Sequence, residues 1–407
     1  MRNILFLSHP YHRGGVTQWM ADAFNEWNDN FGNAYFVTVQ PKQIFISAPD
    51  RPEVRTMLSC SYQQHLFFAS VGRLFELGTL EYKASTYRKI IKKVIYQGTP
   101  VIPSDDEACW MAAAACADRN PMVAILHADE ELYFQLVEKY KAFVCVFICV
   151  SSRILIKLLK RYPQFSNRAI ALPCGILVDQ FTLAPDKAEI IAWVGRLSRY
   201  QKRAQDIIPL FEIVREKWPA CRLQVLGHGD YSETIITEAE QLELRDSVEI
   251  TGWVDSAEIR RRLSKTKVFL QTSDFEGTSV AMMEALASGC TVVSTRVSGA
   301  EDLESLPEAG DVIYLYSIGN IEEGARLMIN AIRDHNLTSS EKARSLASKY
   351  FDCKVNIKIL FNFTDEVMRQ EVKFRSWTIS VVKIYISPLI ALVRWSKRLL
   401  NNFLIKG

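Results

Sequence analysis

Two glutamates with seven residues between them are the most suggestive chemical feature of this 407-residue sequence. Glu276 and Glu284 lie in the segment 274–289, which leads from a β-rich stretch through a polar loop into a helical stretch. The hydroxyl residues at 278–279 are good helix caps, and Gly289 is well placed to end the helix. Free N–H groups at the start of a helix, together with carboxylates, can bind a ligand that has both an anion and hydroxyl groups. A sugar joined to a diphosphate and a ribose has this chemistry.

By spacing alone, the same pair fits an ordinary strand–helix connection with two solvated carboxylates. The surrounding frame, Asp-Phe-Glu-Gly-Thr-Ser…Met-Glu-Ala-Leu-Ala-Ser-Gly, decides between these readings. It resembles the signature of the retaining GT-B glycosyltransferases of family four. The resemblance implies that Glu276 is catalytic and lies beside the donor sugar, and that Glu284 binds the ribose hydroxyls. It also implies that the donor is bound by the backbone amides of Gly277, Thr278, Ser279 and Val280.

A basic segment, 194–203, follows another predicted strand. It reads Val-Gly-Arg-Leu-Ser-Arg-Tyr-Gln-Lys-Arg and resembles the Gly-Arg-Leu…Lys element of the same family. The resemblance implies that Arg196 and Lys202 bind the donor diphosphate. Two fixed cations would stabilise the charge of a departing diphosphate without a metal ion. The spacing between Arg196 and Lys202 is one residue longer than in the commonest form of the element, so Arg199 or Arg203 could take the place of one of them. Without the resemblance, a basic loop is more often a solvated turn.

Two candidates lie at the ends of predicted strands in the first half. Gly15 follows the strand 4–7, where only glycine allows a close backbone approach, although a simple tight turn is the alternative. The resemblance implies that a backbone N–H there contacts the diphosphate or the acceptor. His127 follows the strand 122–126. A lone histidine is usually structural, but the family places a histidine facing the donor sugar at this point, so a catalytic role is expected.

Three further segments complete the list of candidate sites. Val254 follows the predicted strand 247–251 and is expected to make main-chain contacts near the nucleobase. The turn 173–176 resembles the family's Asn-Gly-Val turn, with cysteine in place of asparagine. Gly-His-Gly at 227–229 nearly spells a dinucleotide fingerprint. We reject NAD binding there, because the third glycine is missing and the motif follows the second strand of its series.

Short β-rich runs alternate with helical stretches along the whole chain, which predicts parallel sheets in βαβ order. Seven runs precede the polar segment 179–189 and six follow it. Together with the resemblance, this pattern predicts an α/β protein of the GT-B class. Two Rossmann-like, doubly wound domains would face a central cleft, and a C-terminal helix would return to the first domain. The predicted parts are an acceptor-side domain 1–182, a nucleotide-sugar domain 183–339, a returning segment 340–371 and a basic amphipathic tail 372–407.

Composition limits the class of protein. Apolar residues make up 48% and charged residues 23%, which is ordinary for a globular chain and excludes a disordered one. The net charge of +3 gives no reason to expect a nucleic-acid partner. The nine cysteines have no zinc-like spacing, so buried thiols in a reducing compartment are expected. The first apolar run has only four residues, too short for a signal peptide, so a cytoplasmic location is expected.

The end of the sequence has a different character. After Glu371 there are no acidic residues but seven basic ones, and Trp377–Trp395 is nearly continuous apolar sequence. Lys383 and Pro388 interrupt that run, so a segment in the membrane interface is favoured over a span, and a helix docked on the first domain is the alternative. With basic stretches at 83–93 and 153–168, the tail suggests a lipid-linked acceptor at the cytoplasmic leaflet.

The resemblance implies a retaining, metal-independent hexosyl transfer from a nucleotide-diphosphate sugar to a saccharide or lipid-linked acceptor. Surface polysaccharide or lipopolysaccharide assembly is the expected setting, with no cofactor beyond the donor substrate. No residue is a convincing covalent nucleophile, so front-face attack is expected, assisted by an oxygen of the leaving phosphate. A nucleotide-sugar epimerase, a phosphorylase and a non-catalytic GT-B-like scaffold are the competing hypotheses.

Overall fold

The computed structural model describes residues 3–8, 15–41, 60–71 and 78–371. The chain forms two compact units. One comprises Met1–Ile125, Phe134–Phe147 and Phe361–Gly407, and the other comprises Leu126–Tyr133 and Ile148–Leu360. The short segment 126–133 therefore belongs to the same unit as residues 148–360.

The first sheet has seven strands in the order β3-β2-β1-β4-β5-β6-β7. Its members are β1 (Asn3–Ser8), β2 (Asn33–Pro41), β3 (Leu66–Val71), β4 (Val101–Pro103), β5 (Met122–Leu126), β6 (Val144–Cys149) and β7 (Ala169–Ala171). The pairs β1–β2, β2–β3, β1–β4 and β4–β5 are parallel. Every residue of β5 and β6 is buried, as expected for the unbroken apolar runs of a sheet that is covered on both faces.

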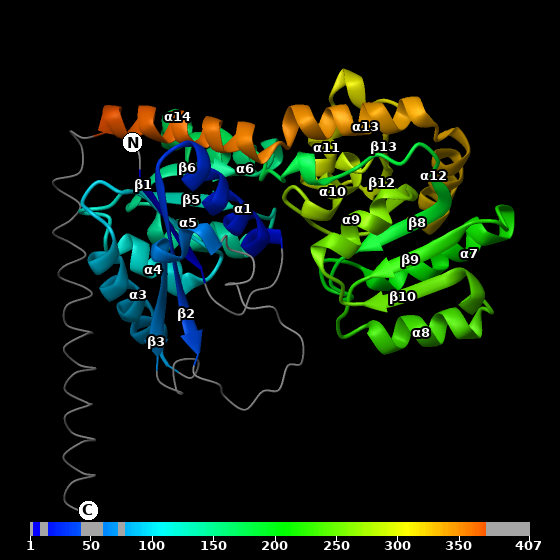
Figure 1. The fold of residues 1–407 in the computed structure, drawn as a ribbon, viewed down its shortest axis with the longest axis horizontal. Helices are drawn as coiled ribbons and strands as arrows, with labels where there is room; N and C mark the ends of the chain where they lie inside the picture. Colours follow the sequence, from blue (N-terminus) through cyan, green and yellow to red (C-terminus); the bar gives the residue numbers. More distant parts are fainter. Residues whose placement is uncertain (1–2, 9–14, 42–59, 72–77, 372–407) are drawn as a thin grey trace, which may run out of the picture. The chain divides into compact units, whose positions relative to one another are not determined.

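Helices alternate with these strands, as the sequence predicts (Figure 1). They are α1 (Gly15–Asn30), α3 (Leu80–Val94), α4 (Glu107–Ala114), α5 (Glu131–Tyr140) and α6 (Ser152–Arg161), with 3-10 turns η1 (Cys60–His65), η2 (Pro163–Arg168) and η3 (Val178–Gln180). Helix α4 ends at Ala114, because the N–H groups of Cys116 and Ala117 bond to carbonyls three residues back and tighten the chain into a turn.

The second sheet has six strands in the order β10-β9-β8-β11-β12-β13, and all five neighbouring pairs are parallel. Its strands are β8 (Ala188–Val194), β9 (Arg222–Leu226), β10 (Val248–Gly252), β11 (Thr266–Gln271), β12 (Thr291–Thr295) and β13 (Ile313–Tyr316). The chain order reverses between β8 and β11. Ligands of such sheets bind outside the carboxyl ends of the two strands where the order reverses.

Helices cover both faces of the second sheet. They are α7 (Ile207–Lys217), α8 (Ser232–Gln241), α9 (Ser256–Ser264), α10 (Val280–Ala287), α11 (Ser298–Glu304), α12 (Ile321–Asp334) and α13 (Leu337–Tyr350), with 3-10 turns η4 (Ala204–Asp206), η5 (Arg245–Ser247) and η6 (Pro307–Ala309). Helix α12 packs on α7 and on β11–β13, whereas α10 packs on α9, α13 and β11–β12. Trp193, Phe211, Tyr316 and Met328 are buried in the core on the α7–α12 side.

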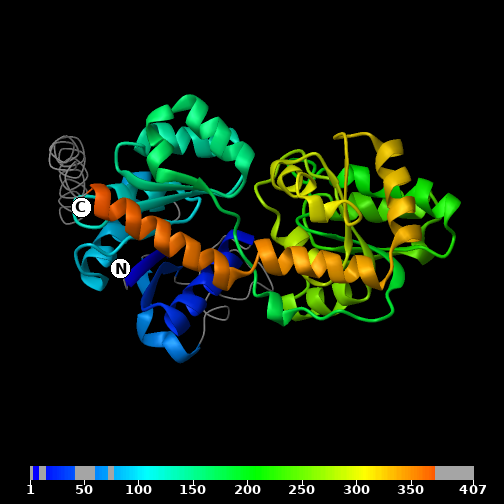
Figure 2. The same cartoon turned by 90° about the horizontal axis from the view of Figure 1, so that it is seen from above.

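The last described helix, α14 (Cys353–Glu371), brings the chain back to the first unit. Phe361 lies 5.6 Å from Trp27 and 6.0 Å from Phe31, measured between ring centroids, at the end of α1. Figure 2 shows the end of α14, in orange and red, lying along the blue and cyan elements of the first unit. The predicted C-terminal return is therefore confirmed. No helix among the described residues is both long and apolar enough to cross a bilayer. The tail 372–407, including Trp377–Trp395, lies outside the described residues.

Candidate functional site

The loop 272–279 connects β11 to α10 at the point where the strand order reverses. Ser279 caps the helix, its hydroxyl accepting the N–H of Met282 at 3.4 Å, and Gly289 ends it with a φ of +79°. The amides from Gly277 to Ser279 therefore precede the helix, and Val280 is its first residue. Glu284 is half-buried and lies just over one turn into α10.

Glu276 forms the centre of the site. Its side chain is buried, and its Oε1 atom accepts hydrogen bonds from the Nζ atom of Lys202 and from the Oγ atom of Ser273, both at 2.6 Å. The neighbouring positions of β8 and β11 in the sheet bring these side chains together from loops some seventy residues apart in sequence. Since both bonds reach one oxygen, the described part of the chain leaves the other oxygen of Glu276 open to a ligand.

The loop after β8 is fixed to the loop after β11 through its backbone. Thr272 donates from Oγ1 to the carbonyl of Lys202 at 2.6 Å, and the N–H of Asp274 bonds to the carbonyl of Gln201 at 2.7 Å. Gln201 and Arg203 have φ angles of 67° and 45°, a left-handed conformation that non-glycine residues seldom adopt. Strain of this kind persists where surrounding contacts enforce it, often at functional sites.

The two arginines that could substitute for Lys202 have other partners. Arg203 bonds to Asp206 at 2.7 Å and to Asp274 at 3.2 Å, and these carboxylates raise the pKa of its guanidinium. Arg199 lies over the ring of Tyr231 at 5.2 Å. Lys202 is therefore the cation beside Glu276.

Arg196, the second predicted phosphate ligand, is exposed on the same loop. Its guanidinium makes one long bond, 3.4 Å, to the Oε1 atom of Gln201. A bond this long holds the guanidinium weakly, so the side chain can turn to an anion.

Hydroxyl groups from β12 and α11 hold the backbone of the loop 272–279. Thr295 donates to the carbonyl of Ser273 at 2.6 Å, and Ser298 donates to that of Glu276 at 2.7 Å. The N–H of Gly299 bonds to the carbonyl of Gly277 at 2.8 Å. The sequence analysis missed Ser273, Thr295 and Ser298. Nothing local to these residues reveals their role, which depends on β12 lying next to β11.

His127 meets the same loop. A Cβ atom on Gly277 would lie 2.1 Å from the carbonyl oxygen of His127, so only glycine fits there. The next turn of the chain continues the contact, since the N–H of Asp129 bonds to the carbonyl of Glu276 at 3.2 Å. The ring of His127 is buried, with Nδ1 at 3.5 Å from the Sγ atom of Cys174. The cysteine in the 173–176 turn therefore contacts the predicted histidine.

Two predicted residues belong to other segments of the chain. Gly15 is the first residue of α1 in the first unit, and residues 9–14 before it lie outside the described part of the chain. Val254 is half-buried between β10 and α9. Their roles as donor ligands stay predictions.

The glycines of the rejected dinucleotide motif serve packing between loops. A Cβ atom on Gly227 would lie 1.7 Å from the carbonyl oxygen of Gly195, and one on Gly229 would lie 2.1 Å from that of Leu197. The loop after β9 thus packs closely on the loop that carries Arg196 and Lys202.

Comparison with known proteins agrees with this geometry. Residues 178–347 match the family model described as glycosyl transferases group 1. Over this segment the chain is similar to group 1 glycosyltransferases. The matched segment contains all the contacts between Glu276, Lys202 and Ser273.

Curated relatives match over part of their length. The chain is 35% identical over 147 residues to the putative colanic acid biosynthesis glycosyltransferase WcaL of Escherichia coli, covering 33% of this chain and 36% of that protein. It is 32% identical over 146 residues to the poly(glycerol-phosphate) alpha-glucosyltransferase of Bacillus subtilis, covering 35% of this chain and 21% of the relative. The matches thus span about a third or less of these relatives.

Solved structures match over most of the chain. Staphylococcus aureus TarM superposes with a TM-score of 0.72 at 12% identity, over 89% of this chain and 100% of that chain. Sucrose-phosphate synthase from Thermosynechococcus elongatus gives 0.70 at 14% identity, over 91% of this chain and 100% of that chain. At such identities the likeness establishes the fold, and the predicted GT-B architecture is confirmed.

Proposed function

We propose that this chain is a retaining glycosyltransferase that transfers a sugar from a nucleotide-diphosphate donor to a saccharide or lipid-linked acceptor during assembly of a surface polysaccharide. The ion pair of Lys202 with Glu276 carries the proposal, because it lies where the sheet order reverses, inside the segment that is similar to group 1 glycosyltransferases. The names of relatives support the setting, since WcaL is assigned to colanic acid biosynthesis and AmsK of Erwinia amylovora to amylovoran biosynthesis. Anabaena HepE, of similar fold, was solved with UDP-glucose.

Lys202 and Arg196 would bind the donor diphosphate. An ammonium group has three donors, and Glu276 takes one of them, so two remain for phosphate oxygens. Arg196 is free to add a forked contact from the same loop. As the bond to the sugar breaks, negative charge grows on the diphosphate, and these fixed cations stabilise it. We therefore infer that the reaction needs no metal ion and no cofactor.

The state of Glu276 supports front-face attack. Its carboxylate accepts two short hydrogen bonds on Oε1, one from a cation, and such bonds lower the nucleophilicity of a carboxylate. In the proposed step, the bond from the anomeric carbon to the diphosphate breaks while the acceptor oxygen bonds on the same face. The acceptor's proton passes to the leaving phosphate oxygen, so configuration is retained. Glu276 and the nearby amides position the donor sugar.

We further propose peripheral contact with an anionic membrane, chiefly through the tail 372–407. The basic stretch 153–168 contributes less to this membrane contact than its composition suggests, because several of its cations are paired. In the structure Arg153 and Lys157 both pair with Asp129, and Arg161 pairs with Glu131. On α3, Lys89, Lys92 and Lys93 are exposed.

Donor binding tests the proposal. Purified full-length chain would be titrated with UDP-, GDP- and ADP-sugars in a calorimeter, and one nucleotide class is expected to bind. In Glu284→Ala the affinity for that donor should fall about 10- to 100-fold, because a charge-assisted hydrogen bond to the ribose is lost. Glu308→Ala, which removes an exposed glutamate paired with Lys349, is the matched control.

Each hypothesis about function gives a different result in this assay. Unchanged donor affinity in Glu284→Ala would remove the ribose assignment, and no binding of any nucleotide sugar would refute the function itself. Conversion of the donor without any acceptor would indicate an epimerase. Binding without turnover of any donor–acceptor pair would indicate a scaffold.

A further inference from the structure

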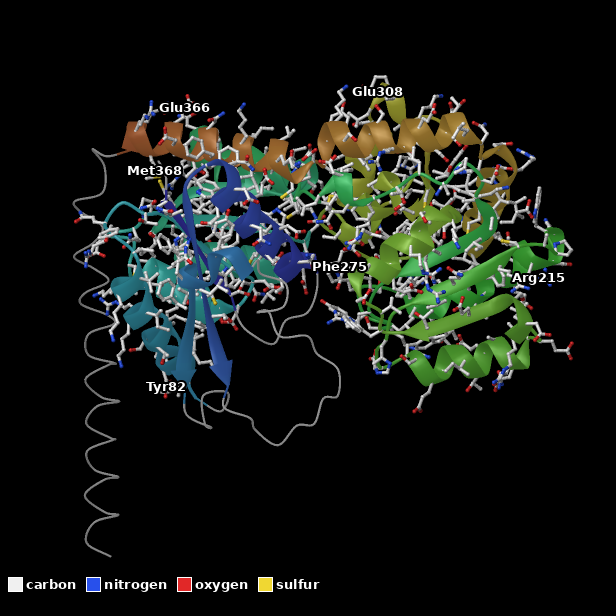
Figure 3. All side chains as sticks on the ribbon, viewed as in Figure 1. Tyr82, Arg215, Phe275, Glu308, Glu366 and Met368 are labelled. Carbon is white, nitrogen blue, oxygen red and sulfur yellow. The ribbon has the colours of Figure 1, made fainter. Side chains whose placement is uncertain are left out.

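An aromatic pair, one ring of which is exposed, flanks the ion pair of Lys202 and Glu276. Tyr200 lies two residues before Lys202, and Phe275 lies directly before Glu276. The ring centroids of Tyr200 and Phe275 are 5.4 Å apart with their planes at 66° (Figure 3 labels Phe275 at the edge of the second unit). Phe275 is half-buried, whereas Tyr200 is 67% exposed. An aromatic ring as open as that of Tyr200 adds little to the core.

Tyr200 is nevertheless held at both ends. Its hydroxyl donates to the Oε1 atom of Glu130 at 2.8 Å. Its carbonyl accepts from the Oγ atom of Ser198 at 2.7 Å and from the N–H of Lys202 at 2.8 Å. Ordering an exposed side chain costs conformational entropy without the gain from burial. A fixed, solvent-facing ring is therefore better explained by a ligand than by stability.

The turn that follows Tyr200 adds to this order. Gln201 and Arg203 hold left-handed backbone conformations on either side of Lys202, and the N–H of Asp274 fixes the carbonyl of Gln201 at 2.7 Å. The loop therefore carries Tyr200 and Lys202 in one strained, well-anchored turn. Strained turns of this kind concentrate where a ligand is bound.

The chemistry around the pair selects among ligands. Aromatic faces carry partial negative charge and attract the partially positive C–H groups that line one face of a pyranose. Glu130 accepts from the hydroxyl of Tyr200, whereas Glu276 and Asp274 are already paired with Lys202 and Arg203. The carboxylate of Glu130 beside the ring of Tyr200 favours a ligand with hydroxyl donors.

We propose that Tyr200 and Phe275 form a stacking platform for a neutral saccharide ring of the acceptor, with Glu130 accepting from one of its hydroxyls. The proposal rests on the proposed function and deepens it, since it names a neutral sugar, rather than a lipid headgroup, as the part of the acceptor bound beside Glu276. Tyr200 uses one carboxylate oxygen of Glu130, which leaves the other for the sugar.

Saturation-transfer NMR can test the platform. The probes are methyl β-D-glucopyranoside, methyl β-D-galactopyranoside and methyl α-D-mannopyranoside, each added to full-length chain saturated with UDP. At least one glycoside should receive saturation on the C–H groups of a single ring face. Tyr200→Ala should weaken its binding by about 3- to 10-fold, whereas Tyr200→Phe keeps the ring and most of the signal. Tyr96→Ala removes a tyrosine that is 76% exposed on the first unit and should change nothing.

The possible results distinguish failure of the saccharide platform from failure of the proposed glycosyltransferase function on which it rests. If UDP and other nucleotides fail to bind, the proposed function is refuted. If UDP binds but no glycoside receives saturation, or Tyr200→Ala leaves the signal intact, the platform is wrong and the function stands. Equal loss in Tyr200→Phe and Tyr200→Ala would assign the effect to the hydroxyl and would also overturn stacking.

Discussion

At the scale of single residues, one carboxylate oxygen receives both bonds that define the site. The Oε1 atom of Glu276 accepts from Lys202 and from Ser273, each at 2.6 Å. A group shared in this way behaves as a unit, so the effects of removing its members do not add. Under the proposed function, the donor would bind to an already formed pair, in which Lys202 would serve the carboxylate and the phosphate together.

Lys202→Ala should lower kcat by about 100- to 1,000-fold, because a fixed cation at the leaving group is lost. Glu276→Ala should cause a similar loss. The double variant should be little worse than the poorer single one, with a coupling energy of about 2.7–4 kcal/mol, roughly the loss in one single variant. Steady-state kinetics with the identified donor measure all three.

Lys342→Ala is the matched control, since it breaks an exposed ion pair with Asp311 of the same length, 2.6 Å. Exposed pairs contribute about 0–1 kcal/mol, so activity should persist. Strictly additive losses in the Lys202 and Glu276 variants would show that the two residues act separately and would contradict the site as described.

The sequence predicted the residues whose types are unusual at their positions. Glu276, Lys202 and Arg196 could be found because charged residues in a specific frame stand out against ordinary loops. Ser273 and Ser298 could not, because serine is common and their hydroxyls matter only through partners brought close by the sheet. Arg203 shows the converse: its charge fits the motif, but Asp206 and Asp274 engage it in the folded chain.

At the scale of elements, the loop between β11 and α10 depends on close backbone contacts. A Cβ atom at Gly277 would lie 2.1 Å from the carbonyl oxygen of His127 and 2.4 Å from a methyl group of Val150. A carbonyl cannot rotate away as a side chain can, so the loop itself must move. Gly277→Ala should therefore destabilise the chain by about 1–3 kcal/mol and weaken donor binding.

Gly310→Ala gives a clean comparison, because nothing lies within 4 Å of the added methyl group and the backbone is ordinary. Its effect should be neutral or slightly stabilising. Urea denaturation and donor titration of both variants check the pair. A Gly277→Ala protein as stable and as active as Gly310→Ala would show that the contact with His127 is not required.

The strands were the most predictable elements. β5 begins and ends at the residues that the sequence indicates, Met122–Leu126, because a short β-rich run with sharp polar ends leaves one choice. The start of α10 was less predictable. Thr278 and Ser279 are both good caps, and only the folded chain shows that Thr278 instead donates to the carbonyl of Val150, leaving Ser279 to cap the helix.

At the scale of the whole molecule, stability should depend on pH through His335. Burial and the charges of Lys187 and Lys267 lower its pKa from 6.5 to about 4. Its two ring nitrogens lie 3.0 Å from the hydroxyls of Thr291 and Ser340, joining β12 to α13. The unfolded chain binds the proton more readily, so stability from the neutral ring is complete above pH 6.5 and is lost as pH falls towards 4.

This linkage should cost the chain roughly 1–3 kcal/mol of unfolding free energy between pH 6.5 and 4, less than the full shift implies because the ring is only partly buried. His335→Gln removes the titrating group, so its stability should fall less over the same interval, even if it is lower at pH 7. Urea denaturation at several pH values measures both. Parallel pH profiles for the two proteins would exclude His335 as the cause.

Membrane binding of the whole molecule should depend on its basic C-terminal tail. The tail after Glu371 carries Lys373, Arg375, Lys383, Arg394, Lys397, Arg398 and Lys406 without a single acidic residue. Near an anionic bilayer each basic side chain contributes about 1 kcal/mol, and salt screens this attraction. Full-length chain should therefore float with phosphatidylglycerol vesicles at low salt and less so at high salt, while a chain ending at Glu371 should remain unbound.

Donor affinity provides the control for this truncation. Glu276, Glu284 and Lys202 all belong to the second unit and precede the deleted residues in the chain, so the shortened chain should bind its nucleotide sugar as before. Equal flotation of the full-length and truncated proteins would refute the proposed membrane contact of the tail. Loss of both flotation and donor binding would instead mean that the tail supports the fold. If only flotation is lost, the tail delivers an intact enzyme to a lipid-linked acceptor, and the saccharide platform at Tyr200 is left to select its sugar.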